Sequence, residues 1–400
     1  METSKMKLIA AIPPEQLEAY RDYLNKSQRN FNAVYSAVES QVLYNQLQRL
    51  FEGYYDLGTI KEIYEVFGGY TNRSFGVIAV KDGVEKEYFI RKYKAEATDT
   101  DVLMEHGLIE FVIKNGFQEA AGLFRTTDDR SFVRLDELKR GKSISRVFAI
   151  YRFLPGADKY TWIDNHSTAE EFRNLGSLLA RFHSSGYGFE PDSSQRKTEP
   201  KIPVLIPDFK RMFGERSAQP IDTHFHSYFT QALPIIFKHL DEQVITPAEY
   251  AALPQCPIHG DYHAGNVKFD GEATVGLYDF DWSKVDVRLF DVCLGLVYCC
   301  ASWKMETDGQ LRLDDCRNFL DGYEAGLNGH KFPPFTDVEK KVFVRMLSGG
   351  FFYLIYWLTE LWYYLDIDGI NNYEAISYLD HFIRGLNWLK ANSSTLAGLV

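Results

Sequence analysis

The sequence predicts an α+β fold in two lobes, with a small mixed sheet first and a mostly helical lobe after it. The chain has 400 residues, which is more than one hydrophobic core usually covers. Alternating strand patterns and hairpin turns are concentrated between residues 54 and 153. After the break at Leu154-Pro155-Gly156, helical periodicity dominates, interrupted by a hairpin pattern at 257–292. We therefore expect a hinge at this break.

The first lobe is expected to combine several strands with one well-capped helix. Polar helical patterns come first, at 16–24 and 31–50. Strands are predicted at 60–67, 74–80, 87–93, 124–135 and 146–153, and the turn Lys81-Asp82-Gly83 joins the second to the third. Residues 99–115 form a predicted helix, which Thr98 or Asp99 caps and Gly116 ends.

The second lobe is expected to be helical outside its hairpin. Helices are predicted at 168–183, 228–240, 294–303, 312–327, 338–365 and 373–389, and a Ser-, Lys- and Pro-rich loop at 191–207. The most lipid-like stretch, 346–365, contains Gly349-Gly350, Glu360 and many aromatic residues. These features favour a buried amphipathic helix over a membrane span.

Composition and charge narrow the class of partner. A net charge of −11 argues against nucleic acid or an anionic membrane, since both call for a basic patch. The five cysteines form no CxxC pair, which indicates buried free thiols in a reducing compartment. The first residues show no signal-peptide pattern, so we expect a soluble, cytoplasmic protein.

The hairpin at 257–292 carries the chemistry. His259-Gly260-Asp261 is followed five residues later by Asn266, and an apolar strand pattern then leads to Asp279. This is the spacing that kinases use for a catalytic base and two magnesium ligands. We expect Asp261 to orient the acceptor hydroxyl and take its proton, while Asn266 and Asp279 bind Mg²⁺ on the phosphates of ATP.

Three neighbours of these residues are expected to support the catalytic loop. His259 is interpreted as a structural residue that holds the loop by hydrogen bonds, and His263 is a less certain candidate for the same role. Asp291 is expected to cap a helix, to brace the loop backbone, or to do both. A hydrolytic metal site built on His259, Asp261 and His263 is the alternative, with the His-containing stretch 223–226 as the other source of ligands.

The first lobe offers a second half of the site. The Gly68-Gly69 turn and the adjacent Asn72 suit phosphate binding, because backbone N–H groups there are not shielded by side chains. Glu105 lies early in its helix and follows a strand with Arg91 and Lys92, so it could pair with either cation. Strand alternation lets only one of the two face a nucleotide, and the pattern does not decide which.

The motifs HGDYHAGN (259–266) and GLYDFDWSKVDVRLFDV (276–292) resemble those of the aminoglycoside phosphotransferase and choline kinase superfamily. The resemblance extends to GGYTNRSFGV (68–77), YRFLPG (151–156) and FRNLGSLLARFHSSG (172–186). It implies a bilobal protein-kinase-like fold that uses ATP and Mg²⁺. It also implies that Tyr151 and Phe153 meet adenine and that Glu105 pairs with a strand lysine, where this chain has Arg91.

Within the superfamily, two resemblances compete for the substrate. The first half and the RLFDV segment (288–292) are most similar to type II homoserine kinases and related sugar kinases, whereas 351–364 and 378–386 are similar to the end of choline and ethanolamine kinases. Asp281, Trp282 and Glu360 are candidate substrate contacts. The aromatic stripe at 351–364 is interpreted as helix core in preference to a cage for an ammonium group.

These observations lead to one expected function and one alternative. We expect a helical extension at 1–44, a nucleotide-binding lobe at 45–154, and a catalytic and substrate-binding lobe at 155–400. The protein is expected to phosphorylate a hydroxyl of an amino alcohol, homoserine-like or sugar-like metabolite, as a monomer or homodimer. The alternative is a catalytically weak or inactive nucleotide-binding regulator of the same fold.

Overall fold

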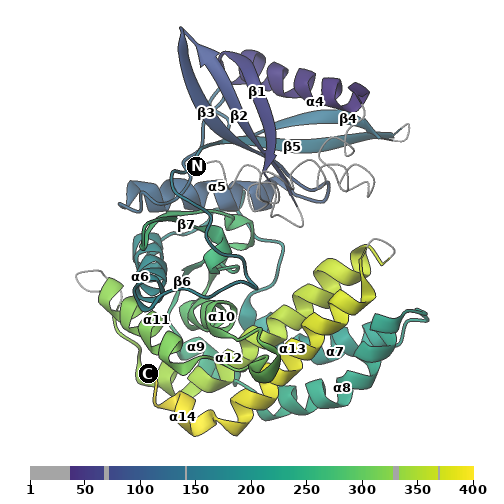
Figure 1. The fold of residues 1–400 in the computed structure, drawn as a ribbon, viewed down its shortest axis with the longest axis vertical. Helices are drawn as coiled ribbons and strands as arrows, with labels where there is room; N and C mark the ends of the chain where they lie inside the picture. Colours follow the sequence, from purple (N-terminus) through teal and green to yellow (C-terminus); the bar gives the residue numbers. More distant parts are fainter. Residues whose placement is uncertain (1–36, 67–71, 140–141, 328–332, 368–369) are drawn as a thin grey trace, which may run out of the picture.

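The computed structural model describes residues 37–66, 72–139, 142–327, 333–367 and 370–400. Figure 1 shows two lobes, with a sheet in the upper one and a mostly helical assembly below it. The predicted α+β bilobal fold is therefore confirmed. The predicted helix at 16–24 and the Gly68-Gly69 turn lie outside the described residues.

The sheet of the first lobe has five strands. They are β1 (Thr59–Val66), β2 (Arg73–Lys81), β3 (Val84–Lys92), β4 (Val133–Lys139) and β5 (Lys142–Arg152), in the order β1-β2-β3-β5-β4. All four pairings are antiparallel, so the sheet is not mixed as predicted. At the β2–β3 turn, Asp82 and Gly83 have φ values of 52° and 76°, which is the geometry of a tight hairpin.

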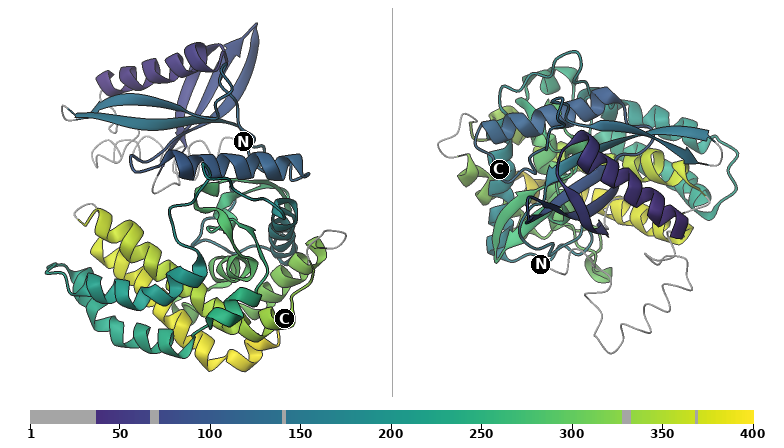
Figure 2. Two further views of the ribbon diagram at one scale, coloured as in Figure 1. Left: turned by 180° about the vertical axis from the view of Figure 1, so that it is seen from behind. Right: turned by 90° about the horizontal axis from the view of Figure 1, so that it is seen from above.

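Two helices pack near this sheet, one on the sheet itself and one between it and the helical lobe (Figures 1 and 2). Helix α4 (Ala37–Arg49) and the π-helical turn η2 (Leu50–Tyr54) bury Leu47, Leu50 and Phe51 in the sheet's own hydrophobic cluster. The predicted boundary at residue 44 falls inside α4. Helix α5 (Asp99–Lys114) lies between the sheet and the helical lobe in both side views (Figures 1 and 2).

Two predicted segments differ from the structure. The strand predicted at 124–135 begins only at Val133, because a turn with Asp129 at φ 63° interrupts the extended chain. Thr126 closes that turn by accepting a hydrogen bond from the Arg130 N–H. The loop predicted at 191–207 ends at residue 201, because α7 (Ile202–Ser217) follows it. This helix has a proline in its first turn, a position at which proline costs no hydrogen bond.

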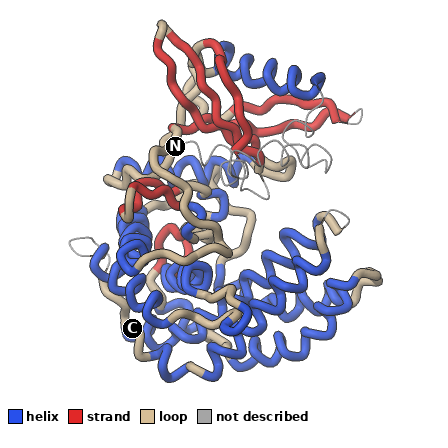
Figure 3. Tube along the Cα trace, viewed as in Figure 1, coloured by secondary structure: helices blue, strands red, loops and turns tan. Residues whose placement is uncertain are grey.

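The second lobe is mostly helical (Figure 3). Its helices are α6 (Ala169–Gly186), α7 (Ile202–Ser217), α8 (His224–Glu242), α9 (Pro247–Ala252), α10 (Arg288–Cys300), α11 (Leu313–Gly326), α12 (Asp337–Tyr356), α13 (Asn372–Ala391) and α14 (Ser393–Ala397). Helix α12 continues as the π-helical turn η6 (Trp357–Trp362) and the 3₁₀ turn η7 (Tyr363–Leu365), while η5 (Met305–Thr307) follows α10. Helix α10 begins at Arg288, earlier than the predicted 294.

Two small antiparallel sheets lie where the lobes meet. β6 (Gln255–Ile258) pairs with β9 (Lys284–Val287), and β7 (Val267–Asp270) pairs with β8 (Ala273–Leu277). The 3₁₀ turns η3 (Ala264–Asn266) and η4 (Phe280–Trp282) stand at the ends of the β7–β8 hairpin. The interlobe connection is fastened to this hairpin, because Ala157 and Phe269 exchange both backbone hydrogen bonds. Gly156 adopts φ 98°, and a Cβ there would lie 2.9 Å from the Phe269 carbonyl oxygen.

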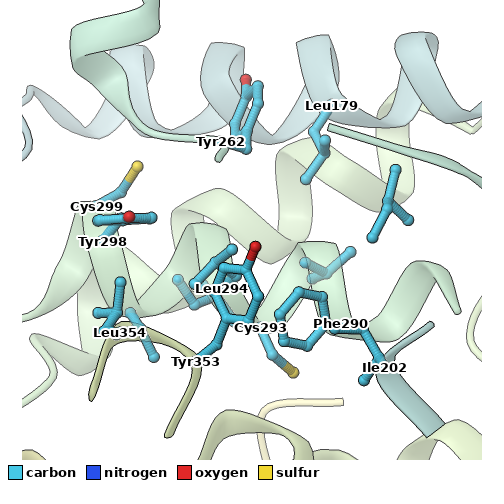
Figure 4. Close-up of a cluster of buried hydrophobic side chains, with 14 of the residues drawn as sticks. Leu179, Ile202, Tyr262, Phe290, Cys293, Leu294, Tyr298, Cys299, Tyr353 and Leu354 are labelled. Atoms are coloured by element: carbon cyan, nitrogen blue, oxygen red, sulfur yellow. The ribbon is translucent and has the colours of Figure 1, made fainter. Parts of the chain in front are cut away.

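Helix α10 is the centre of the lower core. Every residue of α10 is buried, and Figure 4 shows its side chains packed against Leu179, Ile202, Tyr353 and Leu354. All five cysteines are free and buried, as predicted. Within the described residues, one helical run, Asp337–Leu365, is long and apolar enough to cross a membrane, but 83% of its apolar window is buried in the protein. Its burial fits the predicted core helix.

Candidate active site

The loop between β6 and β7 brings Asp261 and Asn266 together. The Asn266 amide nitrogen donates to the backbone carbonyl of Asp261 over 2.8 Å and to its carboxylate over 3.3 Å. This bond uses the amide nitrogen, so the Asn266 carbonyl oxygen is the atom suited to a metal ion. Asp279 follows β8 with φ 69°, a left-handed conformation that turns the chain sharply into η4.

The negative charge of Asp279 acts on the partly buried carboxylate of Asp261. Burial, and then the negative charge of Asp279, raise the pKa of Asp261 to about 8. The hydroxyl of Tyr298 opposes that rise by hydrogen bonding to Asp261. Two carboxylates and one amide oxygen that face each other in this way form a donor set suited to a hard divalent cation.

A buried carboxylate braces the catalytic loop. Asp291 accepts hydrogen bonds from the backbone N–H groups of His259 and Gly260, over 2.7 and 2.9 Å, and from His183 of α6 over 2.9 Å. Asp291 lies in the first turn of α10 and does not cap that helix, whose N-cap residue is Val287. Burial raises the pKa of Asp291, but these hydrogen bonds outweigh it and leave the pKa below its usual value.

The two histidines of the loop make different contacts. His259 is buried, and its Nε2 lies 3.0 Å from the backbone oxygen of Tyr278, which ties the two arms of the site together. His263 accepts from the Gly265 N–H at Nδ1, so the neutral ring carries its proton on Nε2, 3.8 Å from the Asp261 carboxylate. His263 therefore lies beside the Asp261 carboxylate.

The stretch 223–226, the further source of ligands for the alternative hydrolytic site, makes its contacts in the α8 region. His226 hydrogen bonds to Tyr364 at Nδ1 over 2.7 Å, and His224 stacks on Tyr373, both within the α8 region. Among the described residues, no three or more His, Cys, Asp or Glu side chains are grouped as a metal site.

Arg91 enters the site, and Lys92 does not. The Arg91 guanidinium is buried and donates to Glu105 over 3.2 Å and to Asp279 over 2.7 Å. Lys92 lies on the opposite face of the sheet, where it pairs with Glu137. Arg91 thereby connects a carboxylate of α5 with a carboxylate of the other lobe.

Behind Glu105 lies a hydrogen-bond network that the sequence reasoning missed. The Tyr93 hydroxyl donates to Glu105 over 2.7 Å and lies 2.5 Å from the Tyr151 hydroxyl. His106 Nε2 is 2.9 Å from the Tyr151 hydroxyl, and burial lowers the pKa of His106 to about 3, so its ring is neutral. Tyr151, predicted to meet adenine, directs its hydroxyl into this network. Tyr93 could have been found from its spacing, two residues after Arg91 along an alternating strand.

A cavity of about 370 Å³ runs between the lobes past these groups. Part of its wall is formed by apolar side chains of both lobes, which are Val66, Phe89, Ile109, Ala121, Phe153 and Leu154. Asn72, Arg91, Asp261, Asn266 and Asp279 also line it. Gly69 lies outside the described residues.

Another part of the cavity wall is largely aromatic. It includes Tyr160, Thr161, Trp162, Ile163, Tyr298, Leu354, Trp357 and Phe382. Trp162 is edge-on to Tyr298, Trp303, Trp357 and Tyr378, with ring centroids 4.9 to 6.4 Å apart. The stripe interpreted as helix core thus contributes Leu354 and Trp357 to the cavity. Trp162 was missed because its loop shows no periodicity.

The three predicted substrate contacts have different outcomes. Trp282 lines the cavity. Asp281 accepts a hydrogen bond from Asn72 over 2.8 Å and so joins the two lobes at the phosphate end. Glu360 forms an ion pair with Arg216 and is not among the described residues that line the cavity. Arg216 lies on α7, a helix that the sequence pattern did not predict.

Comparisons with known proteins identify a family and similar folds. A model of the phosphotransferase enzyme family matches residues 63–327. The homoserine kinase of Ralstonia nicotianae is 26% identical over 314 residues, which cover 77% of this chain and 82% of that protein. The structure is similar to a microcompartment-associated aminopropanol kinase (TM-score 0.59, 14% identity, 89% and 99% of the two chains). It is also similar to a spectinomycin phosphotransferase bound to ADP and spectinomycin (TM-score 0.58, 16% identity, 86% and 98%).

Proposed function

Because the chain belongs to the phosphotransferase enzyme family, we propose that it transfers the γ-phosphoryl group of ATP to the hydroxyl of a small amino alcohol. The family and the homoserine kinase relatives make the protein a small-molecule kinase with an alcohol acceptor. The observation that carries the proposal is the meeting of Asp261, Asn266 and Asp279 between an apolar nucleotide end and an aromatic acceptor end. The regulator alternative lacks such support.

We assign the residues the following work. Asp261 accepts a hydrogen bond from the acceptor hydroxyl and takes its proton as the hydroxyl oxygen attacks. Asn266 and Asp279 would hold Mg²⁺, which neutralises charge on the phosphates when bound. Arg91 orients Asp279 through its 2.7 Å bond and binds phosphate oxygens beside it. The adenine would lie near Phe153.

The aromatic part of the cavity wall favours an amino alcohol. The faces of Trp162 and Trp357 line the cavity and can hold an ammonium group. Homoserine remains the second candidate, because the curated relatives are homoserine kinases. Turnover with aminopropanol, ethanolamine and homoserine compared under identical conditions separates the two.

The Asp261→Asn variant tests the proposed chemistry. Asn keeps the size and the hydrogen-bonding capacity of the side chain but cannot take the proton. We expect turnover to fall by a factor of about 10² to 10⁴, the usual value of general-base catalysis, with nucleotide binding retained. Magnesium-dependent ADP release and calorimetric binding of a non-hydrolysable ATP analogue measure the two effects. Full turnover in this variant would refute the assignment.

The setting of this reaction follows from the same proposal. The expected partners are ATP and a small hydroxyl compound, in the cytoplasm, without nucleic acid or membrane. The domain division at residues 44 and 154 remains a prediction, as does a monomeric or homodimeric state.

A further inference from the structure

The loop between α6 and α7 crosses from one lobe to the other. Thr198 donates from its backbone N–H and its hydroxyl to Asp101 of α5, over 2.7 and 2.8 Å. Glu199 accepts from Lys284 of β9, over 2.6 Å, in the other lobe. We call residues 195–199 the strap. These contacts fasten it to α5 on one side and to β9 on the other.

Lys197 is the strap residue that reaches the catalytic hairpin. Its ammonium group donates to the backbone carbonyl of Asp281 and lies 5.5 Å from the ring centroid of Trp282, which lines the cavity. Lys94, which follows β3 in the other lobe, lies 5.2 Å from the same ring. Two lysines from different lobes therefore lie against the ring of Trp282, three residues after Asp279.

The two ammonium groups are available to bind an anion. Both side chains are half-buried, and among the described residues neither has a carboxylate at ion-pair distance. Burial raises the pKa of Glu105, and Arg91 and Lys197 oppose that rise, so the charge of Lys197 reaches the carboxylate behind the cavity. Such a pair of cations beside a metal-binding carboxylate is suited to an anionic group.

We propose that Lys197, together with Lys94, binds the terminal phosphate of ATP, and that the strap exists to place Lys197 there. The inference rests on the proposed function, which puts the triphosphate beside Asp279. An acceptor group is the less suitable anion, because the acceptor end lies around Trp162 and Trp357. Arg91 is already shared between two carboxylates, so further cations are needed for the charge of the terminal phosphate.

The test compares nucleotides that differ in their terminal phosphate. Binding of AMP-PNP, ADP and AMP with Mg²⁺ is measured by calorimetry for the wild type and for Lys197→Met, Lys197→Arg and Lys94→Met. We expect Lys197→Met to weaken AMP-PNP binding roughly tenfold, as for one charge-assisted hydrogen bond, and to change ADP and AMP binding less than about twofold. Lys197→Arg should restore most of the loss. Arg196→Met, at the exposed neighbouring position, is the matched control and should bind all three like the wild type.

Each other outcome has a definite meaning. Equal losses for AMP-PNP, ADP and AMP would show that the strap is only structural and would overturn the proposal. A rise in the KM of the acceptor with unchanged AMP-PNP binding would place the lysine on the acceptor and would also overturn it. A wild-type protein that binds no nucleotide would refute the proposed function itself, whereas unchanged binding in Lys197→Met beside an active wild type would refute this inference alone.

Discussion

Arg91 makes its two bonds through two different nitrogens of one planar group, a geometry that a lysine does not reproduce. One end of its planar guanidinium binds Glu105 of α5, and the other binds Asp279 after β8. An ammonium group is a single point of charge on a flexible stem and would favour one carboxylate over the other. The replacement of the usual lysine therefore changes how the phosphate end is held together, while a cation remains in place.

We expect Arg91→Lys to raise the KM for ATP by about tenfold or more, the loss of one hydrogen bond between charged groups. The acceptor KM should change little, because Arg91 lies at the nucleotide end. Steady-state kinetics with each substrate varied in turn provides the measurement. Lys92→Arg, on the opposite face of β3, is the control. An unchanged KM for ATP in Arg91→Lys would show that the two-nitrogen geometry of the guanidinium is dispensable.

The raised pKa of Asp261 has a consequence for stability. The value of about 8 in the folded protein lies above the ordinary value of 3.8, so between these pH values the folded state binds more protons than the unfolded state. The contribution of this group to stability therefore falls as pH rises through that window.

Asp261→Asn should thus stabilise the metal-free, nucleotide-free protein, and more so at pH 8 than at pH 5. We expect a rise in Tm at pH 8 of roughly 1 °C for each kcal/mol of relieved repulsion. Thermal unfolding of both proteins across pH 5–8 with EDTA present checks this. A Tm difference that is zero, or that shrinks as pH rises, would contradict the cause given for the shift.

The catalytic loop and α10 behave as one element. The loop keeps two backbone N–H groups, those of His259 and Gly260, inside the protein because the Asp291 carboxylate of α10 accepts both. His183 of α6 donates to the same carboxylate. Without this acceptor the N–H groups would be buried without partners, which costs free energy.

Asp291→Asn should therefore lower the free energy of unfolding by about 1.5–3 kcal/mol, because an amide nitrogen would face one of the donors. Turnover should fall as well, since the position of Asp261 depends on the loop. Urea denaturation, with the slope compared to exclude a change in the unfolded state, measures the first effect. Asp314→Asn on the exposed face of α11 is the control. Wild-type stability in Asp291→Asn would remove the bracing role.

Elements marked by local sequence signals could be predicted, whereas contacts between segments distant in the sequence could not. Strand alternation and turn residues are local signals, so the hairpin that carries Asp261, Asn266 and Asp279 could be predicted from the sequence. Helix α7 was missed because its prolines suggest a loop, and only packing of its buried face stabilises it. The sequence indicated Glu360 as a candidate substrate contact because its ion-pair partner, Arg216, lies on that unpredicted helix.

The cavity is lined by residues of both lobes, so a ligand bound in it contacts both lobes and affects their relative position. Asn72 and Asp281 form a hydrogen bond between the lobes, and Arg91 and Asp279 form an ion pair between them. A nucleotide held with a divalent cation adds contacts to both sides at once. Anything that binds the folded state alone stabilises it by mass action.

A non-hydrolysable ATP analogue with Mg²⁺ should therefore stabilise the protein by about 2.7 kcal/mol at a concentration near 100 times its Kd. Removing the metal with EDTA should reverse most of this, because the triphosphate charge would then face Asp261 and Asp279 without a cation between them. Asp279→Asn should lose the metal-dependent part of the effect and keep the metal-independent part. Thermal unfolding with and without analogue, Mg²⁺ and EDTA measures all three. Stabilisation by the analogue that is equally large in EDTA would mean that Asp279 and Asn266 do not hold the metal on the nucleotide.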